Sequence, residues 1–372
     1  MEDKRGSHRK RYGFVVRGDR STLAEEVLEQ ANDARFREWV DFVRLCGAVE
    51  VRAKPELLEA LGPELDTARI PALLGLKPGL SAGDLDLEIL VALSTCPSPI
   101  EFGDITELKY GIRVRRNVIQ ESLKTQLAFS TEEAQRPSAF WDYSEETGFV
   151  VRPGQSVIEA LRAATQPAIT GTKFAFSCYR ATEYVVLLAI ALELERVSSP
   201  LLEVLQRQME QFAIKSRRFH DVFLREYGSM EEPLPMRFYI PGERVWFRNP
   251  DSLSSDVEGY EGSWVFYLGQ GHFSNFWQED QTYTLENKAV ELFHWRHGLF
   301  VDEEGKGRIN ENIVDLHVRK TLSDTTLSRA VLERMLRYRD MSGTYVNGGC
   351  IDTTREYPRF LGVTLGCELS AS

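Results

Sequence analysis

Apolar residues recur at helical spacing over much of the first 95 residues. A capping-box pattern at Ser21 is followed by apolar positions three and four residues apart, which predicts a helix over 21–31. The same spacing predicts a helix over 34–46 and short helices over 57–61 and 70–74, which prolines separate. We therefore expect residues 1–95 to form a helical N-terminal region with a basic tail, bounded by the turn-rich segment 94–99.

The pattern then mixes helical and strand periods. Helical spacing predicts helices over 105–127, 155–165, 201–223, 285–295 and 324–338, and an apolar run over 184–194 predicts a buried helix that begins near Cys178. Alternating β-branched and aromatic residues predict a hairpin over 140–152 and strands over 237–240, 244–247, 263–268 and 271–277.

The expected fold class is therefore α+β, with helices around a small antiparallel sheet. The sheet and its helices occupy residues 100–340 in this interpretation. Residues 341–372 contain several glycines and predict an extended or loosely packed C-terminal tail.

Composition narrows the class of protein. The hydrophobic share is 42% of 372 residues and no apolar run reaches the ~18 residues of a membrane span, so we expect a globular protein without a membrane partner. The net charge of −11 argues against nucleic acid as a partner. The basic N-terminus lacks the apolar core of a secretory signal, and we expect a cytoplasmic protein.

Five cysteines are scattered without a C-x-x-C spacing, which argues against a disulfide framework and a structural zinc site. His294 and His297 lie three residues apart on a predicted helix, but no motif supplies further ligands, and His317 and His220 look incidental. We therefore expect no metal and no cofactor.

Cys178 stands at the start of the buried helix. Thr170 and Ser177 can cap that helix or the preceding turn. The unpaired backbone N–H groups of the first helical turn favour a thiolate, so we expect a lowered thiol pKa and a nucleophile. The alternative is a small hydrophobic residue packed in a core, which is common for free cysteine.

Three segments carry a resemblance to a known family. They are Phe174-Ala-Phe-Ser-Cys178-Tyr-Arg-Ala, Pro241-Gly-Glu-Arg-Val-Trp-Phe-Arg-Asn249-Pro250 and Tyr260-Glu-Gly-Ser-Trp-Val-Phe-Tyr-Leu-Gly269. In order and spacing they resemble the bacterial spore-coat type of protein-glutamine gamma-glutamyltransferase, a compact transglutaminase of the papain-like superfamily. Weaker likeness extends from about 102 to 337. The resemblance implies a papain-like core with Cys178 as its nucleophile.

The expected catalytic partners differ from the family. The resemblance aligns Ser263 with the family's glutamate and Asn275 with its histidine. Glu261 and His272 are the nearest replacements for the acid or base, and an arrangement Cys178–His272–Asn275 would follow the logic of Cys-His-Asn sites. A surface carboxylate and a strand-end histidine are the alternatives for these two residues. By strand alternation, Glu261 is expected on the same face as Ser263.

The functional expectation is a cysteine acyltransferase that forms a thioester with a glutamine-type amide. The acceptor is a lysine-type amine of a protein or peptide substrate, or water, which would make the protein a deamidase. The alternatives are a catalytically degenerate member that uses the cleft for binding and a specialised amide-forming or amide-cleaving enzyme. Aromatic residues could line the cleft or fill the core: Tyr179, Trp246, Phe266, Tyr267 and Trp277.

Overall fold

The computed structural model describes residues 12–18, 21–31, 33–77, 81–213, 216–340 and 347–361. Helices and mainly antiparallel sheets alternate along the chain, which confirms the α+β class. The predicted basic tail and Cys367 lie outside the described residues. Among the residues the structure describes, no helix is both long and apolar enough to cross a membrane.

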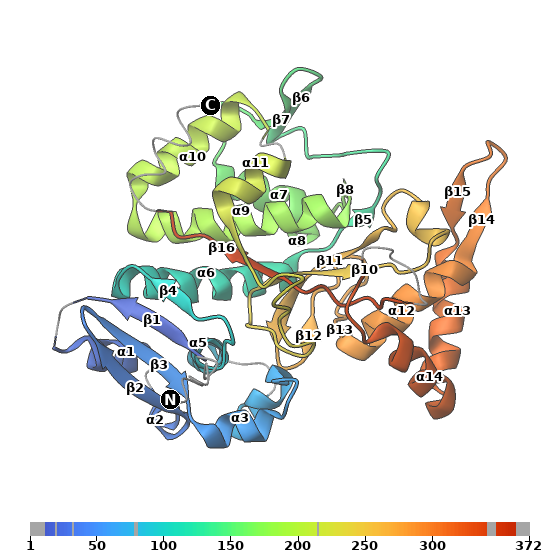
Figure 1. The fold of residues 1–372 in the computed structure, drawn as a ribbon. Coiled ribbons are helices and arrows are strands. Elements are labelled where there is room, and N and C mark those ends of the chain that lie inside the picture. Colours follow the sequence, from blue (N-terminus) through green and yellow to red (C-terminus); the bar gives the residue numbers. More distant parts are fainter. Residues whose placement is uncertain are drawn as a thin grey trace, which may run out of the picture.

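The N-terminal part combines a sheet with short helices (Figure 1, blue). The sheet has the order β2-β3-β1-β4, in which only the β1–β4 pair is parallel. The strands are β1 (Phe14–Arg17), β2 (Val40–Leu45), β3 (Ala48–Ala53) and β4 (Ile100–Phe102). The helices are α1 (Leu23–Ala31), α2 (Arg35–Trp39), α3 (Pro55–Leu61), η1 (Thr67–Arg69), α4 (Ile70–Leu74) and α5 (Ala82–Ser94).

The prediction of a helical N-terminal region was therefore wrong in part. The helix predicted over 34–46 ends at Trp39, and β2 follows it directly. β2 pairs with β3 across a tight turn in which Gly47 has a φ of 67°. The residues Val40, Phe42 and Val43 suit a pleated surface, and this pairing outweighs their helical spacing.

A helical layer occupies the upper part of the view in Figure 1, above the N-terminal sheet (teal to yellow-green). Its buried centre is α9, which contacts α6, α7, α10, α11 and strand β11. The predicted helix over 201–223 is divided into α10 and α11. The elements of this layer are α6 (Ile105–Lys124), β5 (Ala128–Phe129), β6 (Trp141–Ser144), β7 (Gly148–Val151), α7 (Val157–Thr165), α8 (Pro167–Thr170), β8 (Ala175–Phe176), α9 (Cys178–Val197), α10 (Ser199–Gln211) and α11 (Ser216–Phe223).

A six-stranded antiparallel sheet lies beside this layer, with the order β13-β12-β11-β10-β16-β9. Its strands are β9 (Leu224–Tyr227), β10 (Arg244–Arg248), β11 (Gly262–Gly269), β12 (His272–Phe273), β13 (Tyr283–Thr284) and β16 (Arg355–Pro358). Segment 237–240 is not a strand, because prolines flank it and Thr67 occupies the backbone N–H and C=O of Tyr239.

The C-terminal segment is also not a loose tail over its described residues. β16 lies between β10 and β9, and Arg355 is fully buried. Cys350 and Ile351 are buried in the core of the same region. The glycine-rich composition concealed a strand of four residues that completes the central sheet.

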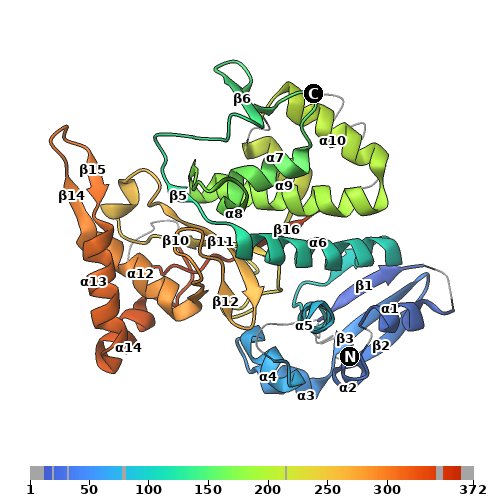
Figure 2. The ribbon, with the colours of Figure 1, turned by 180° about the vertical axis from the view of Figure 1, so that it is seen from behind.

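Three helices pack at the end of the molecule away from the N-terminal sheet (Figure 2, orange). They are α12 (Leu285–Gly298), α13 (Glu311–Leu322) and α14 (Thr325–Met335), with η2 (Ser254–Asp256) and the hairpin β14 (Leu299–Val301) and β15 (Gly307–Ile309) nearby. The sequence reasoning missed α13. Its signal was Asn310, whose side chain caps the helix by accepting from the N–H groups of Asn312 and Ile313.

Candidate active site

Cys178 is the first residue of α9 and is half-buried. The hydroxyl of Ser177 accepts a hydrogen bond from the N–H of Arg180 at 3.3 Å, which confirms Ser177 as the helix cap. One turn further on, Arg180 and Glu183 form an ion pair at 2.6 Å, as expected for a helix-face pair.

Burial raises the pKa of the Cys178 thiol, contrary to the expected lowering. The backbone N–H of Trp264 and the positive charges of Lys288 and Arg244 act in the opposite direction but do not offset the loss of solvation. The helix terminus alone therefore does not give a thiolate, and deprotonation of this sulfur depends on groups around it.

Two cavities meet at Cys178. The larger has a volume of about 840 Å³ and the smaller about 440 Å³. Cys178, Gly259 and Gly262 line both of them. Cys178 therefore belongs to the wall of both cavities.

Strand β11 separates the two cavities. Ser263 lines the larger cavity and Trp264 lines the smaller, because successive side chains point to opposite faces of a strand. Gly262 is required at the boundary, since a Cβ there would lie 2.3 Å from Nε1 of Trp246. One face of β11 thus lies toward the larger cavity, and the other face lies toward the smaller cavity.

Neutral polar groups dominate one part of the larger cavity. Besides Ser263 and Asn275, the lining includes the side chains of Gln278, Gln281, Thr282 and Asn287. Asn275 uses its Oδ1 to accept from the N–H groups of Trp277 and Gln278, at 3.1 and 3.3 Å. This amide therefore holds the loop after β12, and it has no proton to exchange at neutral pH.

Lys288, on α12, is a buried cation in the same cavity and was missed by the sequence reasoning. Its ammonium donates to Glu291 at 3.1 Å and lies 4.1 Å from the ring centre of Tyr283. It acts on Cys178 through its charge. No local sequence signal indicates that Lys288 is buried, because a Lys and a Glu at i, i+3 spacing are common on exposed helix faces.

The smaller cavity is aromatic and acidic. Tyr179, Trp246 and Trp264 form its walls, and Glu258 and Glu261 are its charged lining residues. The guanidinium of Arg244 lies behind the walls, 3.9 Å from the ring centre of Trp264. Trp277 lines the larger cavity instead, whereas Phe266 and Tyr267 are core residues.

Glu261 lies in the smaller cavity, whereas Ser263 lies in the larger one. The expected shared face was wrong because β11 begins at Gly262, so that Glu261 belongs to the preceding turn. There its Oε1 accepts from the N–H of Gly259 at 3.2 Å.

His272 lines neither cavity. Its side chain is exposed, and Nδ1 lies 2.9 Å from the hydroxyl of Thr282. β12 has only two residues, so Asn275 lies in the following loop and turns into the larger cavity without His272. The structure therefore brings together Cys178, Ser263, Asn275 and Glu261 but not His272.

Comparison with known proteins gives a family match along most of the chain. A model of the protein-glutamine gamma-glutamyltransferase family matches residues 75–347. A solved transglutaminase from Geobacillus stearothermophilus, without its C-terminal extension, is similar with 18% identity and a TM-score of 0.35, over 57% of this chain and 95% of that chain. No curated protein matches the sequence.

Proposed function

The chain belongs to the protein-glutamine gamma-glutamyltransferase family, and from this premise we propose that Cys178 forms a thioester with a glutamine side chain and transfers the acyl group to an amine. The observation that carries the proposal is the position of Cys178 at the junction of two cavities. A transfer between two substrates requires one nucleophile that both can reach.

Acylation starts with the sulfur of Cys178 as nucleophile. The sulfur attacks the carboxamide carbon of the glutamine, the C–N bond breaks, and ammonia leaves with the proton that the thiol gives up. Lys288 and the N–H of Trp264 favour the negative sulfur against the cost of burial. The product of this step is a thioester.

The larger cavity suits the glutamine substrate. Its amide and hydroxyl side chains, including Gln278, Gln281 and Asn287, can donate to and accept from a neutral carboxamide. Asn275 keeps the loop of this wall in place through its bonds to Trp277 and Gln278.

The smaller cavity suits a lysine-type amine. Aromatic walls cover the aliphatic stem of such a side chain, and carboxylates attract its ammonium. Glu261 takes a proton from the amine, the amine nitrogen attacks the thioester carbon, and the C–S bond breaks. The proton then passes from Glu261 to the departing sulfur, which regenerates the thiol and the carboxylate. When water replaces the amine, the same site produces glutamate by deamidation.

The test is incorporation of a fluorescent primary amine into a glutamine-containing peptide, with ammonia release measured in parallel. We expect both signals from the wild type and a loss of at least about 10³-fold in Cys178→Ala. Cys46→Ala is the matched control, because Cys46 is an exposed cysteine outside both cavities. Equal activity of Cys178→Ala and wild type would overturn the proposal.

A second candidate function is binding without catalysis. It is favoured by Ser263 and Asn275, which stand at the positions aligned with the family's glutamate and histidine and cannot act as carboxylate or imidazole. On that account a glutamine-containing peptide binds to wild type and to Cys178→Ala alike, with no release of ammonia from either protein.

A further inference from the structure

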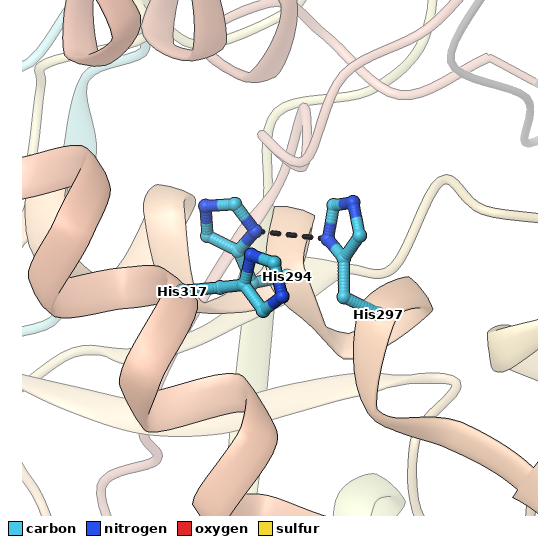
Figure 3. Close-up of side chains that lie close together, drawn as sticks. All are labelled: His294, His297 and His317. Carbon is cyan, nitrogen blue, oxygen red and sulfur yellow. Dashed lines mark hydrogen bonds between the residues drawn. The ribbon is translucent and has the colours of Figure 1, made fainter.

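Three histidines from α12 and α13 lie close together (Figure 3). His294 and His297 lie three residues apart on α12, and His317 comes from α13. One ring nitrogen from each lies within 4.8 Å of the others. The i, i+3 spacing puts the first two on one face, and the packing of α13 against α12 adds the third.

The ring nitrogens of this cluster lie close enough together to converge on one ion. Nδ1 of His294 lies 2.9 Å from Nδ1 of His297, so at least one of the two presents a lone pair to the other. The opposite nitrogen of His294, Nε2, lies 2.8 Å from the hydroxyl of Thr321. A hydrogen bond on the outer nitrogen is the usual way in which a protein orients a metal-binding imidazole.

The third ring completes a compact group. The His317 ring is stacked on that of His297, with centroids 4.6 Å apart and planes 15° apart, and its centroid is 5.4 Å from that of His294. His294 is buried, His317 is half-buried and His297 is exposed. The cluster is therefore anchored on one side and open to solvent on the other.

The charge state of these histidines also favours a role as metal ligands over a role as cations. Burial, together with the neighbouring histidines, lowers the pKa of His294 to about 4 and lowers that of His297. Arg296 adds to this effect, whereas the carboxylate of Asp251 opposes it at His297. Neutral imidazoles are the form that binds a metal ion.

We propose that His294, His297 and His317 form a binding site for a divalent transition-metal ion of the Zn²⁺ type. Three imidazoles and a solvent molecule satisfy the four-coordinate geometry that Zn²⁺ adopts. Zn–N bonds of about 2.0–2.1 Å place ligand nitrogens about 3.3 Å apart. Rotation of the more accessible His297 and His317 rings closes the remaining separation.

The ion links α13 to α12. Both helices line the larger cavity, α12 through Lys288 and Glu291 and α13 through Glu311 and Asp315. Metal binding at the histidines therefore stabilises the wall of the larger cavity that α12 and α13 form. The proposal is independent of the thioester chemistry, because it concerns binding to other residues.

The test uses the full chain without a histidine tag, stripped of metal with a chelator. Titration with ZnCl₂ is followed by calorimetry and thermal unfolding, and Co²⁺ serves as a probe of tetrahedral geometry through its visible absorption. We expect one ion per chain and a rise in the unfolding temperature. His317→Ala and His317→Gln should each weaken binding by at least about 10-fold, and Thr321→Val by about 10–100-fold.

Two controls keep the proposal falsifiable. His272→Ala removes an exposed histidine outside the cluster and should bind Zn²⁺ as the wild type does. Cys178→Ala tests whether the ion binds to the thiol instead. Binding that is lost in Cys178→Ala and retained in both His317 variants would overturn the proposal, as would a failure of the wild type to bind the ion.

Discussion

Glu88 accepts a hydrogen bond from the backbone N–H of Gln270 at 2.8 Å, although 182 positions separate them in the sequence. Glu88 lies on α5, and Gln270 lies in the turn between β11 and β12 with a φ of 55°. Gln270 thus has the left-handed conformation that non-glycine residues rarely adopt. The N-terminal part is therefore bonded directly to the turn that joins β11, which carries Ser263, to β12, which precedes the loop of Asn275.

Glu88 gives the first prediction, on stability against pH. Burial raises its pKa to about 8, so the folded chain holds a proton that the unfolded chain releases at lower pH. The contribution of Glu88 to the free energy of unfolding is full below its ordinary pKa and is lost as the pH rises through about 8.

Glu88→Gln keeps the acceptor oxygen and removes this dependence. We expect the variant to match the wild type near about pH 5 and to exceed its unfolding free energy by about 2–4 kcal/mol near about pH 9, measured by urea denaturation. Glu59→Gln changes an exposed carboxylate on α3 and serves as the control. If the free energies of unfolding of Glu88→Gln and wild type depend on pH in the same way, the raised pKa of Glu88 is contradicted.

Lys288 gives a prediction on the reactivity of the cysteine. Its positive charge lowers the pKa of Cys178 against the effect of burial, so Lys288→Met should raise that pKa further. The rate of alkylation of Cys178 by iodoacetamide should then rise at a higher pH than in the wild type. Lys320→Met changes an exposed position of α13 and should leave the pH profile of Cys178 alkylation unchanged. A pH profile of Lys288→Met that matches the wild type would contradict the electrostatic role of Lys288.

The variants Glu261→Gln and His272→Ala distinguish which of the two residues acts as the base. Glu261→Gln should slow transfer to the amine by about 10²–10⁴-fold, because a positioned base is lost, while hydrolysis of the thioester continues. His272→Ala should leave both steps within about twofold of wild type, the scatter expected of an exposed residue outside the site. The opposite pattern, in which only His272→Ala loses transfer, would exclude Glu261 as the base.

Asn275 is expected to position the wall of the larger cavity without exchanging protons. Asn275→Ala removes the acceptor of the N–H groups of Trp277 and Gln278 and should raise KM for the glutamine peptide more than it lowers kcat. Asn275→Asp retains an acceptor oxygen and should restore KM. A change in the pH dependence of kcat in Asn275→Ala would indicate a direct role in proton transfer.

Local sequence patterns predicted much of the helical framework. The helix that begins at Cys178 was predicted with its cap at Ser177, and both are confirmed. The hairpin of β6 and β7 is also confirmed. These elements depend on short-range periodicity and turns, which the sequence contains directly.

Errors occurred where strand pairing decided the structure. Val40 follows a helix but pairs with Ala53 in the β2–β3 hairpin. Arg355 follows a glycine-rich segment but pairs at long range with Tyr227 inside the central sheet. The contributions of Lys288 and His317 depend on the packing of α12 and α13, which no local motif encodes. The raised pKa of Cys178 has the same origin, because burial is a property of the folded chain.

The account depends most on the thioester at Cys178, and mass spectrometry can detect it directly. The chain is mixed with a glutamine-containing peptide in the absence of an amine, quenched in acid after a short interval, and weighed intact. The account predicts an adduct equal to the peptide minus ammonia, located on Cys178, removed by hydroxylamine and absent from Cys178→Ala. Bound peptide with no covalent adduct on Cys178, or an adduct that persists in Cys178→Ala, would contradict the account.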